Sequence, residues 1–143
     1  MVIVSLKLPL LSWSDSPGVL EAIAGADAIV IAPSNPYVSI WPILAVPEIR
    51  AALATRRAPC VGVSPLVGGR AVKGPADRML ARMAGGTTPE HVAGCYEGLI
   101  DALVVDESDP AGPLAVRRIV TQTLMTDLDA SRRLAEAVLG AAA

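Results

Sequence analysis

The segment AIVIAPSNP, residues 28–36, decides the fold class. Its five apolar residues, closed by Pro33, indicate a short strand that is buried on both faces, as strands of parallel sheets are. Ser34 and Asn35 then favour a turn, because short polar side chains hydrogen-bond to their own backbone and Pro36 restricts φ. A buried strand that runs directly into polar turn residues is a first indication of a parallel α/β sheet.

Strands and helices alternate outward from this segment. Further short apolar runs predict strands at residues 59–63, 100–105 and 118–123. Proline and N-cap signals predict helices at residues 17–24, 47–57, 76–84 and 127–139, and another that begins at residues 88–90. Residues 40–46 and 64–74 are predicted as loops, the first with a helical turn. This order predicts a three-layer, Rossmann-like α/β fold, with a mostly parallel sheet, helices on both faces and a single domain over residues 1–143.

The composition is typical of a folded chain with an aliphatic core. Of the 143 residues, 52% are hydrophobic and 18% are charged, and the absence of Phe leaves the core to Val, Ile, Leu and Ala. The formal net charge is −2 and no long basic block occurs, which argues against nucleic-acid binding. No apolar run reaches the roughly 18 residues that span a membrane, so we expect a cytoplasmic protein with no membrane partner.

Metal and thiol chemistry have little support in the sequence. The single histidine, His91, excludes a His-based metal cluster, and we expect no metal ligands in this chain. Cys60 and Cys95 lie far apart and form no CxxC pair, which favours two reduced thiols. His91 has polar neighbours in a predicted helix and is interpreted as a surface residue.

The loops that follow the predicted strands are the expected ligand site, because open parallel sheets bind ligands at the carboxyl ends of their strands. The most informative loop is GGRAVKGP, residues 68–75. Its glycine amides could approach a phosphate closely, Arg70 and Lys73 add positive charge, and the helix predicted after Pro75 adds the positive end of its dipole. The loop is predicted to bind an anion, with a plain loop and solvated cations as the alternative. Its spacing matches neither a Walker A loop nor GxGxxG.

Polar residues of the other loops allow both a binding and a structural interpretation. Ser34, Asn35 and Ser39 either donate to phosphate oxygens or cap their own turn. Asp127 either binds ribose or a metal, or caps the helix predicted after it. The residues predicted to bind substrate are Ser34, Asn35, Ser39, Ser64, Gly68, Gly69, Arg70, Lys73, Gly74 and Asp127.

Two further kinds of side chain are ambiguous. Asp106 follows a predicted strand and is interpreted as a solvated strand end. Trp13 and Trp41 either stack on a flat ring or pack in the core.

Three ordered segments of the chain resemble the signatures of the 2-phospho-L-lactate transferase (CofD/FbiA) family. They are APSNPYVSI at residues 32–40 with PILAVP at 42–47, SPLVGG at 64–69 with VKGPAD at 72–77, and LMTD at 124–127 with RRLA at 132–135. The resemblance runs from about Ser16 to Leu139 and implies the C-terminal half of a longer enzyme.

The resemblance implies a transferase of coenzyme F420 biosynthesis, which transfers a substituted phosphate group. The hydroxyl of the deazaflavin FO attacks lactyl- or enolpyruvyl-diphosphoguanosine, GMP leaves, and Mg²⁺ assists. Phosphoryl transfer of this kind needs mainly positioning and charge neutralisation. The resemblance assigns Asn35, Ser39, Gly68, Gly69 and Lys73 to the nucleotide diphosphate, and it does not choose between the two donors.

The chain also departs from the family. Met1 to about Trp13 does not resemble it, Trp41 and Glu48 stand where smaller residues are usual, and Cys95 stands where histidine is frequent. Family members are roughly twice as long, and their N-terminal half carries the acidic residues associated with FO and metal.

Catalytic residues are therefore expected in that N-terminal half, and this chain is expected to be a truncated or mis-started product without turnover of its own. A bare sheet edge would favour a homodimer. The alternative function is a non-catalytic regulator of the gluconeogenesis-factor (YvcK-like) type, which binds a nucleotide sugar. The pair Asn35-Pro36 favours the transferase.

Overall fold

The structure is a computed structural model that describes residues 18–72, 78–79, 81–82, 87–110 and 112–143. In chain order its elements are α1 (Val19–Ala24), β1 (Ile29–Ile31), η1 (Pro36–Ile40), α2 (Trp41–Leu44), α3 (Pro47–Ala54), β2 (Cys60–Val63), β3 (Leu66–Val67), β4 (Arg70–Ala71), α5 (Pro89–Cys95), β5 (Ala102–Asp106), β6 (Arg117–Thr121) and α6 (Leu128–Ala142).

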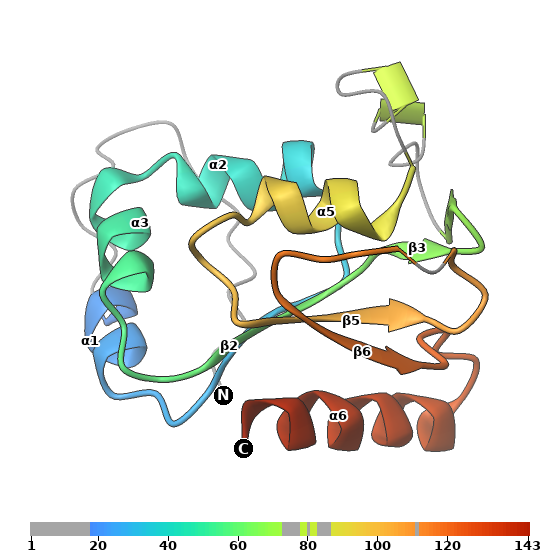
Figure 1. Cartoon of the computed structure of the whole chain (residues 1–143). Coiled ribbons are helices and arrows are strands. Elements are labelled where there is room, and N and C mark those ends of the chain that lie inside the picture. The colour runs from blue at the N-terminus through green and yellow to red at the C-terminus, as the bar shows by residue number, and fades with distance from the viewer. Residues whose placement is uncertain (1–17, 73–77, 80, 83–86, 111) are drawn as a thin grey trace.

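Four strands form one parallel sheet in the order β1-β2-β5-β6. Gly62 of β2 pairs with Ile31 of β1 on one side and with Leu103 of β5 on the other, and Val104 pairs with Ile119 of β6. Because the strands run in the same direction, their carboxyl ends meet at one edge, on the right in Figure 1. The short strands β3 and β4 form a separate antiparallel hairpin.

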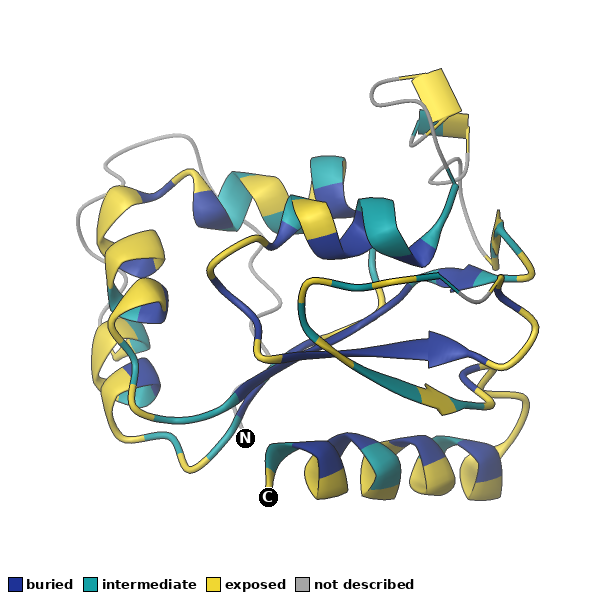
Figure 2. Cartoon of the chain, in the orientation of Figure 1, coloured by how far each residue is buried: buried dark blue, intermediate teal, exposed yellow. Residues whose placement is uncertain are grey.

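Helices cover both faces of the sheet. Residues of α1, α2, α3 and α5 pack in one cluster with Leu103 and Val105 of β5, whereas Leu134 and Val138 of α6 pack with Val104 on the opposite face. Figure 1 shows α2 and α5 above the sheet and α6 below it. All residues of β5 are buried, as the dark strand in Figure 2 shows. The predicted α/β class, with a parallel sheet between helices, is confirmed.

Among the residues that the structure describes, the buried hydrophobic core is aliphatic apart from Cys60 and Tyr96, which are both fully buried. Both cysteines are free thiols, as predicted. Burial raises the pKa of the Cys60 thiol to about 11, so this sulfur stays protonated and unreactive at neutral pH.

Most predicted elements are present with shifted ends. The four predicted strands correspond to β1, β2, β5 and β6, and the helices predicted from residues 47, 88 and 127 correspond to α3, α5 and α6. Helix α3 ends earlier than predicted, at Ala54, and α6 continues to Ala142. The helix predicted from residue 17 begins at Val19 in the described part of the chain, and most of the helix predicted at 76–84 lies outside that part.

Two segments predicted as loops contain regular structure. Residues 36–40 form a π-helical turn, η1, which extends the turn predicted at residues 34–36, and the helical turn predicted within residues 40–46 is confirmed as the short helix α2. Asn35 starts this segment, because its side-chain oxygen accepts hydrogen bonds from the N–H groups of Tyr37 and Val38 at 3.0 and 3.4 Å. Pro36 and Pro42 stand in first turns, where a backbone N–H would have no acceptor within the helix, so a proline there removes no hydrogen bond. The second segment, 64–74, contains the β3–β4 hairpin.

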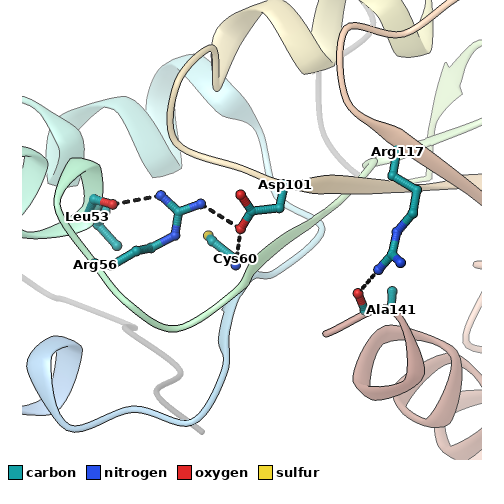
Figure 3. A network of polar contacts seen from close by, with 6 residues as sticks. All are labelled: Leu53, Arg56, Cys60, Asp101, Arg117 and Ala141. Carbon is teal, nitrogen blue, oxygen red and sulfur yellow. Dashed lines mark hydrogen bonds and ion pairs between the residues drawn. The ribbon is translucent and has the colours of Figure 1, made fainter. Parts of the chain in front are cut away.

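A guanidinium group joins the amino ends of the two central strands (Figure 3). Arg56 donates to the Leu53 carbonyl oxygen at 2.8 Å and to the Asp101 carboxylate at 2.7 Å. The same Asp101 oxygen accepts from the N–H of Cys60, the first residue of β2, at 2.8 Å. Desolvation alone would raise the pKa of Asp101, but these hydrogen bonds outweigh it and lower the pKa below its ordinary value.

Replacing Asp101 with asparagine is expected to lower the free energy of unfolding by about 1 kcal/mol. The Arg56 side chain is 8% exposed and would lose its counter-charge, whereas solvent already screens Asp101, whose side chain is 59% exposed. Urea unfolding at neutral pH measures the change. The matched control is Glu136→Gln, which removes an exposed ion pair with Arg132 on α6 and should have almost no effect. Equal losses in the two variants would contradict a specific role for Asp101.

Within the described part of the chain, no single helix is both long and apolar enough to cross a membrane. The bent pair Pro36–Leu44 and Pro47–Ala54, at 89° to each other, meets the requirement only when the two are taken together, by length and composition alone.

Candidate functional site

The loops at the carboxyl edge of the sheet are tied to one another by hydrogen bonds. The loop after β2 contacts the loop after β5, and that loop contacts the one after β6. In both links a backbone N–H donates to a buried carboxylate, of Asp109 in the first case and of Asp106 in the second. The edge that the sequence predicts to bind ligand is thus a connected set of loops.

Asp106, the last residue of β5, holds the loops after β5 and β6 in place. One carboxylate oxygen accepts from the N–H and the hydroxyl of Ser108, and the other accepts from the N–H and the hydroxyl of Thr123 at 2.8 and 2.9 Å. The residue is 3% exposed. Its interpretation as a solvated strand end is therefore wrong. The sequence could not reveal this burial, because it gives no local sign that Thr123 folds back onto Asp106.

The hydrogen bonds of Asp106 also set its charge. Desolvation alone would raise the pKa of Asp106, but the bonds from Ser108 and Thr123 favour the carboxylate form and lower the pKa below its ordinary value. Asp106 is therefore ionised at neutral pH, and its two carboxylate oxygens accept hydrogen bonds from Ser108 and Thr123.

The second link joins the glycine turn to Asp109. Gly68 and Gly69 connect β3 to β4 with φ values of 59° and 72°. Two successive positive φ values are those of a type I′ hairpin turn, which explains why glycine occupies both positions. The Gly69 N–H donates to Asp109 Oδ1 at 2.8 Å, and a Cβ on Gly68 would lie 3.6 Å from the Ser108 hydroxyl oxygen. The glycine turn is thus packed against the loop after β5.

Asp109 changes what this turn offers to a ligand. The residue is 7% exposed, and its Oδ2 has no hydrogen-bond donor among the residues that the structure describes. Because Oδ1 already takes the Gly69 N–H, that amide has a carboxylate partner in place of a phosphate. An anion at the turn would have to rely on the Gly68 side of the turn and on nearby cations.

Ser34, Asn35 and Ser39 follow β1. Asn35 caps η1 as described, and its Nδ2 donates to the Met79 sulfur at 3.4 Å, which links this loop to the segment after the glycine turn. The Ser39 N–H donates to the Asn35 carbonyl oxygen at 3.0 Å, and the residue is exposed. The capping interpretation is confirmed for Asn35, while the exposed Ser39 hydroxyl stays a candidate ligand donor.

The remaining predicted site residues have different surroundings. Ser64 is 1% exposed; its N–H donates to the Val104 carbonyl oxygen at 2.8 Å and its Oγ accepts from the Leu66 N–H at 3.2 Å. Arg70 is exposed on β4. Lys73 and Gly74 lie outside the described residues.

Asp127 caps helix α6, as the structural interpretation predicted. Its Oδ1 accepts from the Ala130 N–H at 2.7 Å, and its Oδ2 accepts from the Thr126 hydroxyl at 3.2 Å. Helix α6 covers the face of the sheet opposite to α2 and α5 (Figure 1).

The structure therefore brings Gly68 and Gly69 against the loop after β5, joins Ser64 to Val104 of β5, and holds Asp127 at a helix start. Sequence analysis missed Ser108, Asp109 and Thr123. An aspartate at a strand end with serine two residues later is typical of a side-chain-to-backbone turn, and this signal could have identified Ser108. The contribution of Thr123 depends on the pairing of β5 with β6 and has no local signal.

The described residues contain no preformed cluster of protein ligands for the Mg²⁺ that the resemblance implies. In the part of the chain that the structure describes, no group of three or more His, Cys, Asp or Glu side chains could hold a metal ion. Asp106 also has both oxygens engaged by protein donors. No catalytic step is assigned to a metal in this chain.

Comparisons with known proteins agree with one another. The family model described as 2-phospho-L-lactate transferase CofD matches residues 6–141. A phosphoenolpyruvate transferase of Kitasatospora aureofaciens is 47% identical over 133 residues, which cover 89% of this chain and 41% of the relative. Those of Streptomyces coelicolor and Mycolicibacterium smegmatis are 45% and 40% identical, and the matches cover 87% and 86% of this chain.

The chain spans about two fifths of the length of these relatives. The family match begins at residue 6, so the expectation that residues up to about Trp13 fall outside the resemblance is wrong for most of that segment. With a family model matched over residues 6–141 and relatives at 40–47% identity, the chain belongs to the 2-phospho-L-lactate transferase CofD family.

Proposed function

We propose that this chain supplies a donor-binding part of a transferase of coenzyme F420 biosynthesis. In the proposed reaction the hydroxyl of the deazaflavin FO attacks the β-phosphorus of an enolpyruvyl- or lactyl-diphosphoguanosine. A P–O bond to FO forms, and the bond between the β-phosphorus and the bridging oxygen breaks, so that GMP leaves. The family match over residues 6–141 carries the proposal, and relatives named phosphoenolpyruvate transferase favour the enolpyruvyl donor.

The geometry of the carboxyl edge favours a limited role for this chain in the proposed reaction. The glycine turn, the exposed Arg70 and Lys73 are the groups proposed to hold the diphosphate. Since the Gly69 N–H is engaged by Asp109, the two cations supply most of the attraction. Their part is to position the donor and to offset its negative charge, which are the main requirements of phosphoryl transfer. Catalytic residues, a magnesium ion, a homodimer and a cytoplasmic location stay predictions.

The proposal is tested by the binding of GDP to the purified chain, measured by isothermal titration calorimetry. We expect the double variant Arg70→Gln/Lys73→Gln to bind GDP about 10- to 100-fold more weakly, because charge-assisted hydrogen bonds to phosphate are lost. The control is Arg57→Gln, which removes one positive charge at an exposed position just before β2, at the opposite edge of the sheet. This control should retain the wild-type Kd.

The same titration distinguishes the transferase from the alternative function, a regulator that binds a nucleotide sugar. Binding of a UDP-sugar by a chain that does not bind GDP would reject the transferase and favour a nucleotide-sugar-binding regulator. Equal loss of GDP affinity in the control and in the double variant would show that the glycine turn has no specific part in binding.

A further inference from the structure

A cavity lies among the helices, on the face of the sheet opposite to α6. Its volume is about 370 Å³, which is within the range of small-molecule sites. Its walls come from η1, α2, α3 and the end of α5, the layer above the sheet in Figure 1. It shares no lining residue with the loops that contain Gly69, Asp106 and Thr123.

Aromatic side chains form one part of this cavity. Trp41 lines it and is 60% exposed, so most of the indole surface is in contact with solvent. Tyr37 and His91 line it as a stacked pair, with ring centroids 6.4 Å apart and planes 29° apart. Exposed and half-buried rings around one cavity offer faces on which a flat ligand can stack.

A cluster of polar side chains lies beside these rings. The Tyr37 hydroxyl lies 2.8 Å from His91 Nε2, and the Cys95 sulfur lies 3.9 Å from the same nitrogen. Burial raises the pKa of both the Tyr37 hydroxyl and the Cys95 thiol, so both carry their protons at neutral pH. The Tyr37 hydroxyl and His91 Nε2 share a hydrogen bond whose donor depends on the His91 tautomer, and in either case the Tyr37 oxygen keeps a lone pair that can accept a hydrogen bond from a ligand.

This protonation argues against a cysteine nucleophile in the cavity. A nucleophilic cysteine needs the thiolate form, which a raised pKa disfavours. The protonated Tyr37 hydroxyl and Cys95 thiol are suited to recognition through hydrogen bonds. Two charged side chains at the cavity extend this recognition: Arg50 of α3 can donate to a carbonyl or anionic group, and the Glu97 carboxylate can accept from ring N–H groups.

We propose that this cavity binds a flat heteroaromatic ring that carries both N–H and carbonyl groups, stacked on Trp41 and hydrogen-bonded to Tyr37, Arg50 and Glu97. Guanine and flavin-type rings share this chemistry. The choice of these two probes rests on the proposed function, but the site itself rests on the cavity and its side chains.

Glycine 94 provides a direct test, because it lines the cavity without a side chain. A Cβ at Gly94 would meet no atom within 4 Å, so a side chain can begin there without a clash, and we expect that of a leucine to extend over part of the cavity. Gly140 of α6 is a matched control: it is also helical, has no atom within 4 Å of an added Cβ, and lies on the opposite face. Neither change should destabilise the fold, since glycine is the poorer helix former.

The experiment measures binding of GDP and of riboflavin by calorimetry to the wild type, Gly94→Leu and Gly140→Leu. Tryptophan fluorescence adds a local signal when the Trp13→Leu background leaves Trp41 as the only indole, since two Trp are present in the chain. We expect at least one probe to bind the wild type and quench Trp41. We expect Gly94→Leu to bind it roughly 10-fold more weakly or worse, and Gly140→Leu to bind it normally.

Each outcome decides a separate point. A response to GDP alone identifies the ring as a nucleobase, and a response to riboflavin alone identifies it as a flavin-type ring. Equal affinities of Gly94→Leu and Gly140→Leu, or no binding of either probe at millimolar concentration, would overturn the cavity proposal. If Arg70→Gln/Lys73→Gln weakens GDP binding and Gly94→Leu does not, the proposed function is supported and the cavity proposal is rejected for GDP. If Gly94→Leu weakens riboflavin binding and the wild type does not bind GDP, the cavity proposal is supported and the proposed binding of the guanosine donor is rejected.

Discussion

Replacing Asp106 with asparagine is expected to lower the free energy of unfolding by about 3 kcal/mol. The carboxylate accepts four hydrogen bonds, two from Ser108 and two from Thr123, at a residue that is almost fully buried. Asparagine keeps one acceptor oxygen and turns an NH₂ group toward the other pair of donors. A backbone N–H would then face a donor at a buried position, and the links between β5 and the loop after β6 would weaken. Urea unfolding measures the loss.

The effect of Asp106→Asn should depend on pH in a defined direction. The folded pKa of Asp106 lies below its ordinary value of 3.8, so the carboxylate stabilises the fold above that pH, and this contribution is lost as the pH falls through the folded pKa. The gap between wild type and variant should therefore be largest near neutral pH and shrink in acid. Glu107→Gln is the control, because the neighbouring residue is exposed. A gap independent of pH, or a similar loss in Glu107→Gln, would contradict the role given to Asp106.

Replacing Gly62 with valine is expected to lower the free energy of unfolding by about 2 kcal/mol. Gly62 lies in the middle of the buried strand β2, and a Cβ there would lie 3.2 Å from Leu103 Cδ1 and 3.4 Å from Ile100 Cδ1. The two further methyl groups of valine have no room, so side chains of the core must shift. The preference of valine for strands offsets only part of this cost.

A double-mutant cycle tests whether crowding against Leu103 causes the loss of stability in Gly62→Val. Leu103→Ala is destabilising by itself because it removes a fully buried side chain, but it also opens space next to residue 62. The double variant should therefore lose less stability than the sum of the two single variants. Gly140→Val, at an exposed helical glycine with no neighbouring atom, should change stability by less than about 0.5 kcal/mol. Strict additivity would exclude contact with Leu103 as the cause.

The sheet could be predicted from sequence because its strands are marked locally. Each of β1, β2 and β5 is a short apolar run that ends in proline or polar residues. Such runs are typical of strands in a parallel sheet, which are buried on both faces. Helix starts at Pro47, Thr88 and Asp127 carry their own proline or N-cap signals. These features act over a few residues and need no knowledge of distant partners.

The missed features depend on partners that are distant in the sequence. Asp106 is buried because Thr123, on the next strand loop, donates to it, and Asp109 is buried beside Gly69, which lies 40 positions earlier. His91 was interpreted as a surface residue, but it is half-buried against Tyr37, which lies 54 positions away. The η1 turn is absent from the prediction for a different reason. Pro36 suggests a tight turn, and Pro42 and Pro47 suggest a loop, although all three prolines occupy first-turn positions.

The two aspartates at the carboxyl edge have a thermodynamic consequence for any ligand that binds there. Ordering a flexible loop costs about 1–2 kcal/mol per residue in backbone entropy. Here Asp106 and Asp109 fix the loops during folding, by accepting the amides of Ser108, Thr123 and Gly69. The wall that these loops form is preorganised, so an incoming molecule does not bear the cost of ordering them, and more of its contact energy appears as affinity.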